Sequence, residues 1–355
     1  MTTKSVNQLP VPDFYSDDNA QSEAYQPNRY GLQREAEAWK KSYALKPVGS
    51  DNLKVHLLII DAQKDFGFPT GSLFVGGRSG SGAMDDHARL AKFIYRRLGI
   101  ISQITCTMDT HLPYQIFYSI AHIDDKGNHP APNTQITAEE YRKGKYRPNP
   151  EMAAQLNVSP VWLQKQFTFY CEQLEKSGKY ALTIWDYHTM LGSPGHALVG
   201  VIEEARLFHC FARGAENIPE IKGGNPLTEH YSIFKPEVTM CFDGNPIPNA
   251  QKNARLIETL LKSDVVIITG EAKSHCLAWS IDDFLTEIVA KDKELAKKIY
   301  LMEDCTSSVV IPKVIDFTAE GDKAFQKFAD AGMNIVSSTT PIEDWTNMAK
   351  KLELI

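Results

Sequence analysis

The sequence predicts an α/β fold: a doubly wound, mostly parallel sheet of six strands flanked by helices and carrying helical insertions. Short apolar runs recur along the chain, and they are continuous rather than alternating. Continuous runs are typical of strands covered on both faces, as in a parallel sheet. Stretches with helical spacing of apolar residues separate these runs. The resulting β-α-β-α order is that of a doubly wound sheet.

The elements follow from these two patterns. Apolar runs predict strands at residues 55–60, 100–107, 180–185, 231–234, 265–269 and 299–302, with 334–337 as a seventh candidate. Helical spacing predicts helices over residues 85–98, 250–262, 276–290 and 321–331. Crossover connections between parallel strands are expected to be right-handed.

The chain is expected to form one domain with an extension. Residues 1 to about 50 are polar and read as an N-terminal arm with one short helix near 34–43. Residues 51–355 form the predicted domain. Two connections are too long for a minimal unit, at about 112–179, which contains a helix near 160–175, and at 205–230. We interpret both as insertions.

Composition limits the class of protein. The chain has 355 residues and a formal net charge of −6, which gives no reason to expect nucleic acid or an anionic membrane as a partner. Its six cysteines are scattered, as expected of reduced thiols. No run approaches the ~18 apolar residues of a membrane span, and the polar start lacks the apolar core of a secretory signal. We expect a cytoplasmic protein.

Chemically active side chains follow the predicted strands. In an open α/β sheet, ligands bind beyond the carboxyl ends of the strands, so residues placed there converge on one edge. The residues that follow the successive apolar runs are Asp61, then Asp109 with His111, then His188, then Lys235, and finally Cys276. This convergence, rather than any one residue, predicts an active site.

Cys276, Asp61 and Lys235 suit nucleophilic catalysis. Cys276 begins a predicted helix, where the helix dipole favours a thiolate. Asp61 is placed to act as a general base, and Lys235 to keep Asp61 ionised and to stabilise the thiolate. Taken singly, each has an ordinary structural reading: a buried filler, a turn-capping carboxylate and a surface lysine. Their placement at neighbouring strand ends favours the catalytic reading.

Asp109, His111 and His188 suit a divalent metal ion. Residues i and i+2 of an extended segment point to the same side, so Asp109 and His111 can share one ion. His188 would be the third ligand, with water completing an open site. Zinc, iron and manganese all accept carboxylate with imidazole.

Five ordered motifs carry a resemblance to a known family. They read DAQKDF at 61–66, DTHLP at 109–113, WDYHTMLGSPG at 185–195, FKP at 234–236 and GEAKSHC at 270–276. In this order they resemble the isochorismatase-like cysteine hydrolases, and among these the nicotinamidases. The resemblance spans residues 55–340. Residues 1–50 and most of 112–179 have no counterpart in it.

The resemblance implies a site and a reaction. The site would consist of a Cys276–Asp61–Lys235 triad, metal ligands Asp109, His111 and His188, an oxyanion hole from the N–H groups of Ala272 and Cys276, a cis peptide between Glu271 and Ala272, and aromatic walls at Phe66 and Trp185. The reaction would be hydrolysis of a small carboxamide through a thioester. Conversion of nicotinamide to nicotinate and ammonia, a reaction of NAD salvage, comes first, with zinc as the first choice of metal.

Departures from the family pattern keep the substrate open. Gln115 stands where nicotinamidases commonly carry a second histidine, and His196 stands where a small residue is usual. Lys273, Ser274 and His275 also depart from the usual residues before the nucleophile. The alternatives are an amidase for pyrazinamide-like, ureido or carbamoyl compounds, and a non-catalytic binding protein. Relatives often self-associate, so a homo-oligomer is a further expectation.

Overall fold

A six-stranded parallel sheet forms the centre of the molecule. The computed structural model describes residues 8–178 and 180–354, so the first seven residues of the predicted arm lie outside it. The strand order is β12-β9-β8-β1-β2-β7, and every neighbouring pair is parallel. The strands are β1 (Val55–Ile60), β2 (Gln103–Asp109), β7 (Glu220–Lys222), β8 (Val265–Gly270), β9 (Ile299–Met302) and β12 (Asn334–Val336). The predicted fold class is confirmed.

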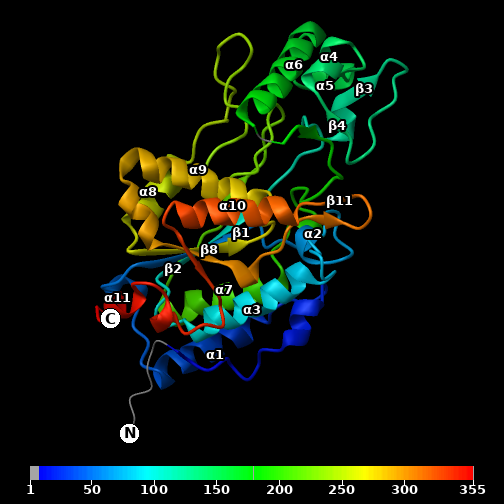
Figure 1. The fold of residues 1–355 in the computed structure, drawn as a ribbon. Coiled ribbons are helices and arrows are strands. Elements are labelled where there is room, and N and C mark those ends of the chain that lie inside the picture. The colour runs from blue at the N-terminus through cyan, green and yellow to red at the C-terminus, as the bar shows by residue number, and fades with distance from the viewer. Residues whose placement is uncertain (1–7, 179, 355) are drawn as a thin grey trace.

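Helices cover both faces of this sheet (Figure 1). One face carries α8 (Ala254–Lys262), α9 (Cys276–Lys291) and α10 (Thr318–Asp330). The other carries α1 (Arg29–Ser42), α3 (Gly82–Arg96) and α7 (Gly200–Arg213). Successive β1 side chains alternate between the two layers: Leu57 joins the cluster under α3 and α7, and Leu58 joins the cluster under α8 and α9. Every β1 residue is therefore buried, which explains its continuous apolar run.

The N-terminal segment packs against the sheet's helical layer. Helix α1 lies along α7, and its Leu32 and Ala36 join the same buried cluster as β1. The buried Arg213 guanidinium fixes the connection that follows α1. It donates to Lys46 O (2.7 Å) and Leu98 O (2.8 Å) and pairs with Asp51.

Removal of this guanidinium is expected to destabilise the fold. Arg213→Met leaves the Asp51 carboxylate with only the Ser102 hydroxyl as a donor and removes the donor to two carbonyls, which should lower the free energy of unfolding by about 3–5 kcal/mol. Arg255→Met is the matched control, because Arg255 is largely exposed and pairs with Glu220 at the surface. That change should cost less than about 1 kcal/mol. Denaturant unfolding of both variants measures the difference, and equal losses would contradict it.

Two predicted strands are wrong. Within 180–185 only β6 (Leu182–Thr183) is extended, and it pairs antiparallel with β4 (Gln135–Ile136) outside the central sheet. Residues 231–234 form no strand; Phe234 instead packs in the cluster under α9 and stacks on Phe284. The sixth strand is β7, whose Ile221 is 67% exposed. A three-residue edge strand with an exposed centre leaves no apolar run in the sequence.

Residues 112–178 and 180–185 form a lobe that projects beyond the sheet (Figure 1). We call it the inserted lobe. Its elements are β3 (His122–Asp124), β4, α4 (Ala138–Arg142), β5 (Tyr146–Pro148), α5 (Pro150–Gln155), α6 (Pro160–Ser177) and β6. Its apolar side chains pack with those of 227–250 around a separate buried cluster. The proposed boundaries of the two insertions stay predictions.

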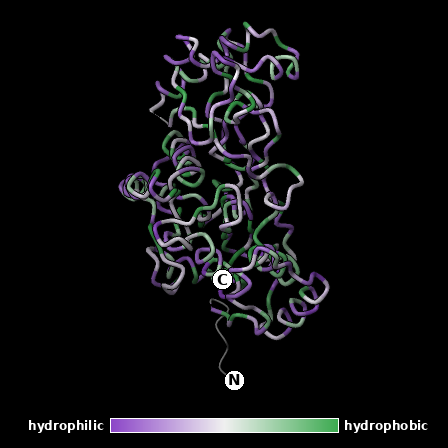
Figure 2. The backbone as a smooth tube through the Cα atoms, turned by 90° about the vertical axis from the view of Figure 1, so that its right-hand side faces the viewer, coloured by the Kyte–Doolittle hydropathy of each residue, from purple (hydrophilic) through white to green (hydrophobic). Residues whose placement is uncertain are grey.

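The remaining elements are short. They are α2 (Lys64–Gly67), α11 (Met348–Leu352), the hairpin of β10 (Val310–Ile311) and β11 (Ile315–Asp316), and the 3₁₀ turns Asp17–Gln21, Val48–Ser50, Ser119–Ala121, Pro194–His196, Lys293–Lys298, Glu303–Cys305 and Ile342–Asp344. Figure 2 shows hydrophilic segments along much of the outline, with hydrophobic ones frequent in the interior. Among the described residues, no helix combines the length and the apolar character needed to cross a bilayer.

Candidate active site and metal centre

Four titratable side chains meet at the carboxyl edge of the sheet. Asp61 directly follows β1, Asp109 ends β2, Lys222 ends β7, and Cys276 begins α9 after β8. Because β7, β2, β1 and β8 are neighbours in the sheet, these strand ends lie side by side. The structure therefore places Asp61, Asp109 and Cys276 together, as the sequence predicts. The lysine that joins them is not the predicted one.

Lys222 is the lysine at the centre of the site. Its Nζ lies 2.9 Å from Asp61 Oδ2, 2.8 Å from Asp109 Oδ1 and 3.7 Å from Cys276 Sγ. The side chains of Lys222 and Asp61 are each only 1% exposed. One buried cation thus contacts both carboxylates and the thiol.

The prediction of Lys235 in this role is wrong. Lys235 Nζ pairs with Asp283 Oδ1 at 3.0 Å, and 38% of the Lys235 side chain is exposed. The sequence pattern indicates Lys235 because it follows the apolar run 231–234, but this run is not a strand. The signal that could have found Lys222 is the Lys-Gly-Gly sequence at 222–224, since glycines after a lysine can mark a tight turn at a strand end.

Asp61 is held in place by its neighbour on β2. Its backbone has φ +46°, a left-handed conformation that aspartate adopts more readily than most residues. The Asp61 N–H donates to Thr107 Oγ1 (2.9 Å), and the Thr107 hydroxyl donates to Asp61 Oδ1 (2.5 Å). This pair of bonds leaves Oδ2 for Lys222. The carboxylate is therefore oriented before any ligand binds.

The charges of the cluster stabilise one another. Burial disfavours the charged amine, but Asp109 and Asp61 outweigh it and raise the pKa of Lys222 well above its usual value. Burial likewise opposes the charge of Asp109, yet His111 and Lys222 hold the pKa of Asp109 well below its usual value. For Asp61 burial prevails over Lys222, and its pKa is raised. A carboxylate with a raised pKa is a better proton acceptor.

Cys276 has the position but not the acidity that the sequence predicts. It is the first residue of α9, as expected. Burial nevertheless raises the pKa of its thiol well above the usual value, with Lys222 opposing the shift and Asp61 adding to it. The expected thiolate is therefore not the resting form. The thiol keeps its proton and lies beside the Asp61 carboxylate.

Two backbone N–H groups beside the thiol have no acceptor in the part of the chain that the structure describes. The peptide between Glu271 and Ala272 is cis, as the resemblance implies. Neither Ala272 N–H nor Cys276 N–H donates a hydrogen bond to any residue that the structure describes. Both residues line the same cavity. Free donors at this point can accept charge that develops on a carbonyl oxygen.

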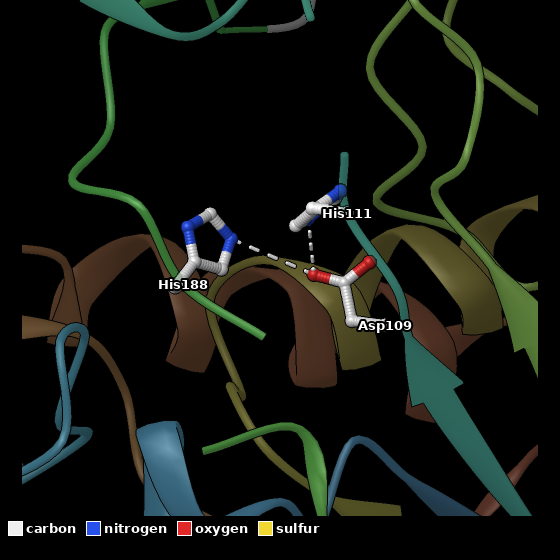
Figure 3. Close-up of side chains that lie close together, drawn as sticks. All are labelled: Asp109, His111 and His188. Carbon is white, nitrogen blue, oxygen red and sulfur yellow. Dashed lines mark hydrogen bonds and ion pairs between the residues drawn. The ribbon is translucent and has the colours of Figure 1, made fainter. Parts of the chain in front are cut away.

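Asp109, His111 and His188 form a buried ligand-type group (Figure 3). Asp109 Oδ2 lies 2.9 Å from His111 Nε2 and 3.6 Å from His188 Nε2. One candidate ligand atom from each residue lies within 4.8 Å of the others. Asp109 and His111 come from the end of β2, and His188 comes from the loop after the inserted lobe.

The donor set fits a divalent metal ion. His111 Nδ1 is 3.2 Å from Gly223 O, and His188 Nδ1 is 2.7 Å from Asp186 O. Each carbonyl accepts an Nδ1–H bond, which leaves the Nε2 lone pair of each ring free toward Asp109. Such outer bonds fix the tautomer and orientation of metal-ligating histidines. One carboxylate and two oriented imidazoles suit zinc, iron or manganese.

Two side chains of the DAQKDF motif at 61–66 hold the backbone next to the metal-ligand candidates. The Gln63 side chain donates to Asp109 O (2.8 Å) and accepts from Asp109 N–H (2.7 Å). Asp65 Oδ2 accepts from Thr189 N–H (2.6 Å), directly after His188. The approach of Asp65 requires a glycine at 195, where a Cβ would lie 2.2 Å from the carboxylate. The motif therefore positions both ends of the ligand set.

A small cavity opens onto Cys276, Asp61, Asp109 and His188. The predicted aromatic walls Phe66 and Trp185 both line it. Its volume is about 30 Å³, the space of about one water molecule. A ring-sized ligand therefore requires the walls to move apart.

Two residues of this cavity were missed from the sequence. Glu229 is buried; burial first, and then Asp109, raise its pKa to about 8. His275 packs against Tyr180, with ring centroids 4.7 Å apart, and burial lowers its pKa to about 3, which keeps it neutral. Glu229 follows none of the predicted strands, so the placement of residues after strands could not identify it. His275 directly precedes Cys276 in the segment after β8, but in the sequence it stands out only as a departure from a family pattern.

Comparison with known proteins gives similarities to solved structures alone. No protein-family model matches this sequence, and no curated protein matches it. Similar solved structures include a nicotinamidase/pyrazinamidase from Acinetobacter baumanii, with 16% identity, 81% of this chain and 97% of that chain covered, and a TM-score of 0.49. The yeast nicotinamidase Pnc1p has 17% identity, with 79% of this chain and 99% of that chain covered and a TM-score of 0.48. The pyrazinamidase of Pyrococcus horikoshii in complex with zinc has 15% identity, with 80% of this chain and 99% of that chain covered and a TM-score of 0.43. At these identities and TM-scores, the function must be argued from the site itself.

Proposed function

We propose that this chain is a cysteine amidohydrolase that cleaves a small carboxamide through a thioester on Cys276. The contact of one buried ammonium group with two carboxylates and a thiol carries the proposal. A structural ion pair needs one partner of each sign. Here the cation also contacts a cysteine, and that cysteine is hydrogen-bonded to one of the carboxylates. This arrangement is typical of nucleophilic catalysis.

Each member of the proposed triad, Asp61, Lys222 and Cys276, has a separate role in the reaction. Asp61 takes the proton of the Cys276 thiol as the sulfur attacks the carbonyl carbon. The N–H groups of Ala272 and Cys276 stabilise the oxyanion that forms. Asp61 then returns the proton to the departing amine, and ammonia leaves. A water molecule, deprotonated by Asp61, hydrolyses the thioester and releases the acid.

Lys222 and the metal group complete the site. Lys222 stays protonated and balances the negative charge that moves between sulfur, oxyanion and Asp61. Asp109, His111 and His188 would hold the metal ion, which supplies a Lewis acid for a ring nitrogen or a water. Asp109 joins the two halves, because one of its oxygens faces Lys222 and the other faces the histidines.

Nicotinamide is the first substrate we propose. The ordered motifs favour it, and Phe66 and Trp185 line the cavity beside the nucleophile and the metal group, so a planar ring that enters as these walls move apart would lie against aromatic side chains. Nicotinamide would give nicotinate and ammonia. Pyrazinamide-like, ureido and carbamoyl compounds are the alternatives within the same chemistry.

Ammonia release from a panel of carboxamides tests the proposal. We expect release from nicotinamide or a related ring carboxamide, at a rate proportional to the enzyme concentration. Metal analysis of the same sample separates a metal-containing enzyme from amidases without a metal. If no carboxamide, ureido or carbamoyl compound releases ammonia, the chain is a binding protein and not an amidohydrolase.

Loss of one histidine ligand is expected to remove the metal. Wild-type protein should hold about one equivalent of zinc, iron or manganese, and His188→Ala should lose most of it, because two ligands rarely hold these ions. His196→Ala is the control, since His196 bonds to Thr110 Oγ1 (2.8 Å) and is not among the ligand-type residues. Elemental analysis after dialysis measures both. Equal metal content in the two variants would contradict the assigned ligands.

A further inference from the structure

Gln115 is a buried amide whose side chain bonds three backbone groups in two segments. It is 0% exposed. Its Oε1 accepts from Leu112 N–H (2.9 Å), and its Nε2 donates to Gly223 O (2.5 Å) and Asn225 O (2.9 Å). Leu112 directly follows His111, and Gly223 directly follows Lys222. Gln115 therefore connects the metal segment to the segment of the central lysine.

The Gly223 carbonyl is shared between Gln115 and a metal-ligand candidate. It lies 3.2 Å from His111 Nδ1, so the same oxygen orients the His111 ring and accepts from Gln115. The backbone is also tied one residue earlier, where Thr110 N–H donates to Lys222 O (2.9 Å). A shift of Gly223 would therefore move the His111 ring and the Lys222 backbone together.

The segment after Lys222 receives little support from the sheet. Strand β7 is three residues long and lies at the edge of the sheet, so only β2 holds it by strand pairing. Gly223 has φ +96°, and a Cβ there would lie 2.7 Å from Asp109 Oδ1. This close approach excludes a side chain that could anchor the turn itself. Gly223 N–H donates to His230 Nδ1 (3.3 Å) and the Asn225 side chain donates to Pro248 O (2.7 Å), but the Gly223 and Asn225 carbonyls are both held by Gln115.

We propose that Gln115 is a positioning residue that holds the metal ligand His111 and the catalytic Lys222 in mutual register. This inference rests on the proposed function. The amide acts only through the Gly223 and Asn225 carbonyls and the Leu112 N–H, and it touches no reacting atom. Loss of its two donors would loosen the 222–225 segment and release the carbonyl that orients His111. Metal affinity and turnover should then fall together.

The test compares Gln115→Met with Gln166→Met. Gln166 is also 0% exposed, lies on α6 of the inserted lobe and accepts from Phe242 N–H (3.0 Å), so it matches Gln115 in size and burial but lies outside the site. We expect Gln115→Met to weaken zinc binding by about 10–100-fold, as loss of outer support typically does. We expect kcat to fall by a similar factor with a smaller change in KM. Gln166→Met should leave zinc affinity and kcat within about twofold of wild type.

Each outcome decides the inference. If Gln115→Met binds zinc and turns over like Gln166→Met, Gln115 is a structural residue and the proposal is overturned. If Gln115→Met does not fold, Gln115→Glu carries the same test, because it keeps an acceptor for Leu112 N–H and loses at least one of the two donors. Zinc titration needs no substrate. It therefore decides the role of Gln115 even where wild-type protein hydrolyses no amide, a result that would refute the proposed function alone.

Discussion

Replacement of Cys276 by alanine is expected to lower kcat by about 10⁴-fold or more, because no other group in the cavity can form the thioester. Cys276 is the only cysteine among the described residues that line this cavity. The variant should still bind metal and substrate, since the metal group and the aromatic walls are untouched. Steady-state ammonia release, zinc content and substrate affinity measure the three properties separately.

A second cysteine provides the control for this change. Cys210, on α7, is partly exposed like Cys276 and lies away from the cavity. Cys210→Ala should keep wild-type turnover. Turnover by Cys276→Ala within about tenfold of wild type would remove the nucleophile from the account, whatever the substrate, since loss of a true nucleophile typically costs far more.

Replacement of Lys222 by methionine is expected to lower kcat by about 10³-fold, whereas Lys235→Met should have little effect. Without Lys222, Asp61 and Asp109 lose their common cation in a buried site. Asp61 then favours its protonated form and cannot take the thiol proton. The same loss should lower the free energy of unfolding by about 3–5 kcal/mol, because buried carboxylates are left unpaired. Kinetics and denaturant unfolding of both lysine variants check the two effects.

The two lysine variants decide between Lys222, the lysine that the structure places in the site, and Lys235, the lysine that the sequence pattern predicts. Lys235 is 38% exposed and pairs with the buried Asp283 on α9, away from the cavity, so Lys235→Met should lower the free energy of unfolding by about 1–3 kcal/mol, less than Lys222→Met, and leave kcat near wild type. Lys222→Arg tests whether positive charge alone is sufficient for turnover, since it keeps the charge but places a larger group in a space that fits an amine. A large loss of kcat in Lys235→Met with normal turnover in Lys222→Met would reverse the assignment.

Burial decided which elements could be predicted. Strands β1 and β8 are covered on both faces, so their sequences are continuous apolar runs and were placed within a few residues. Strand β7 lies at an edge with one exposed apolar residue, so nothing in Glu-Ile-Lys distinguished it from a loop. The apolar run 231–234 was buried as predicted, but against α9 instead of within the sheet. An apolar run in this sequence therefore indicates that a segment is buried, but it does not show that the segment pairs as a strand.

The site could be predicted wherever a residue lay at the end of a correctly placed strand or in the segment that follows it. Asp61, Asp109 and Cys276 meet this condition, and the structure brings them together. Residues 231–234 do not form the predicted strand, so the prediction that Lys235 lies in the site is also wrong. Gln115 and Glu229 lie within connections, where only tertiary structure brings their side chains to the site. The raised pKa of the Cys276 thiol was also beyond the sequence, because it arises from burial that outweighs the helix terminus.

Mass spectrometry of the quenched enzyme tests the central claim most directly. Wild-type protein mixed with an active carboxamide and quenched in acid should carry an added acyl group, and peptide mapping should place it on Cys276. For nicotinamide the added group is a nicotinoyl thioester, formed with release of ammonia. Hydrolysis of the amide with no acyl group on Cys276 in quenched samples, together with turnover by Cys276→Ala, would contradict covalent catalysis by this cysteine.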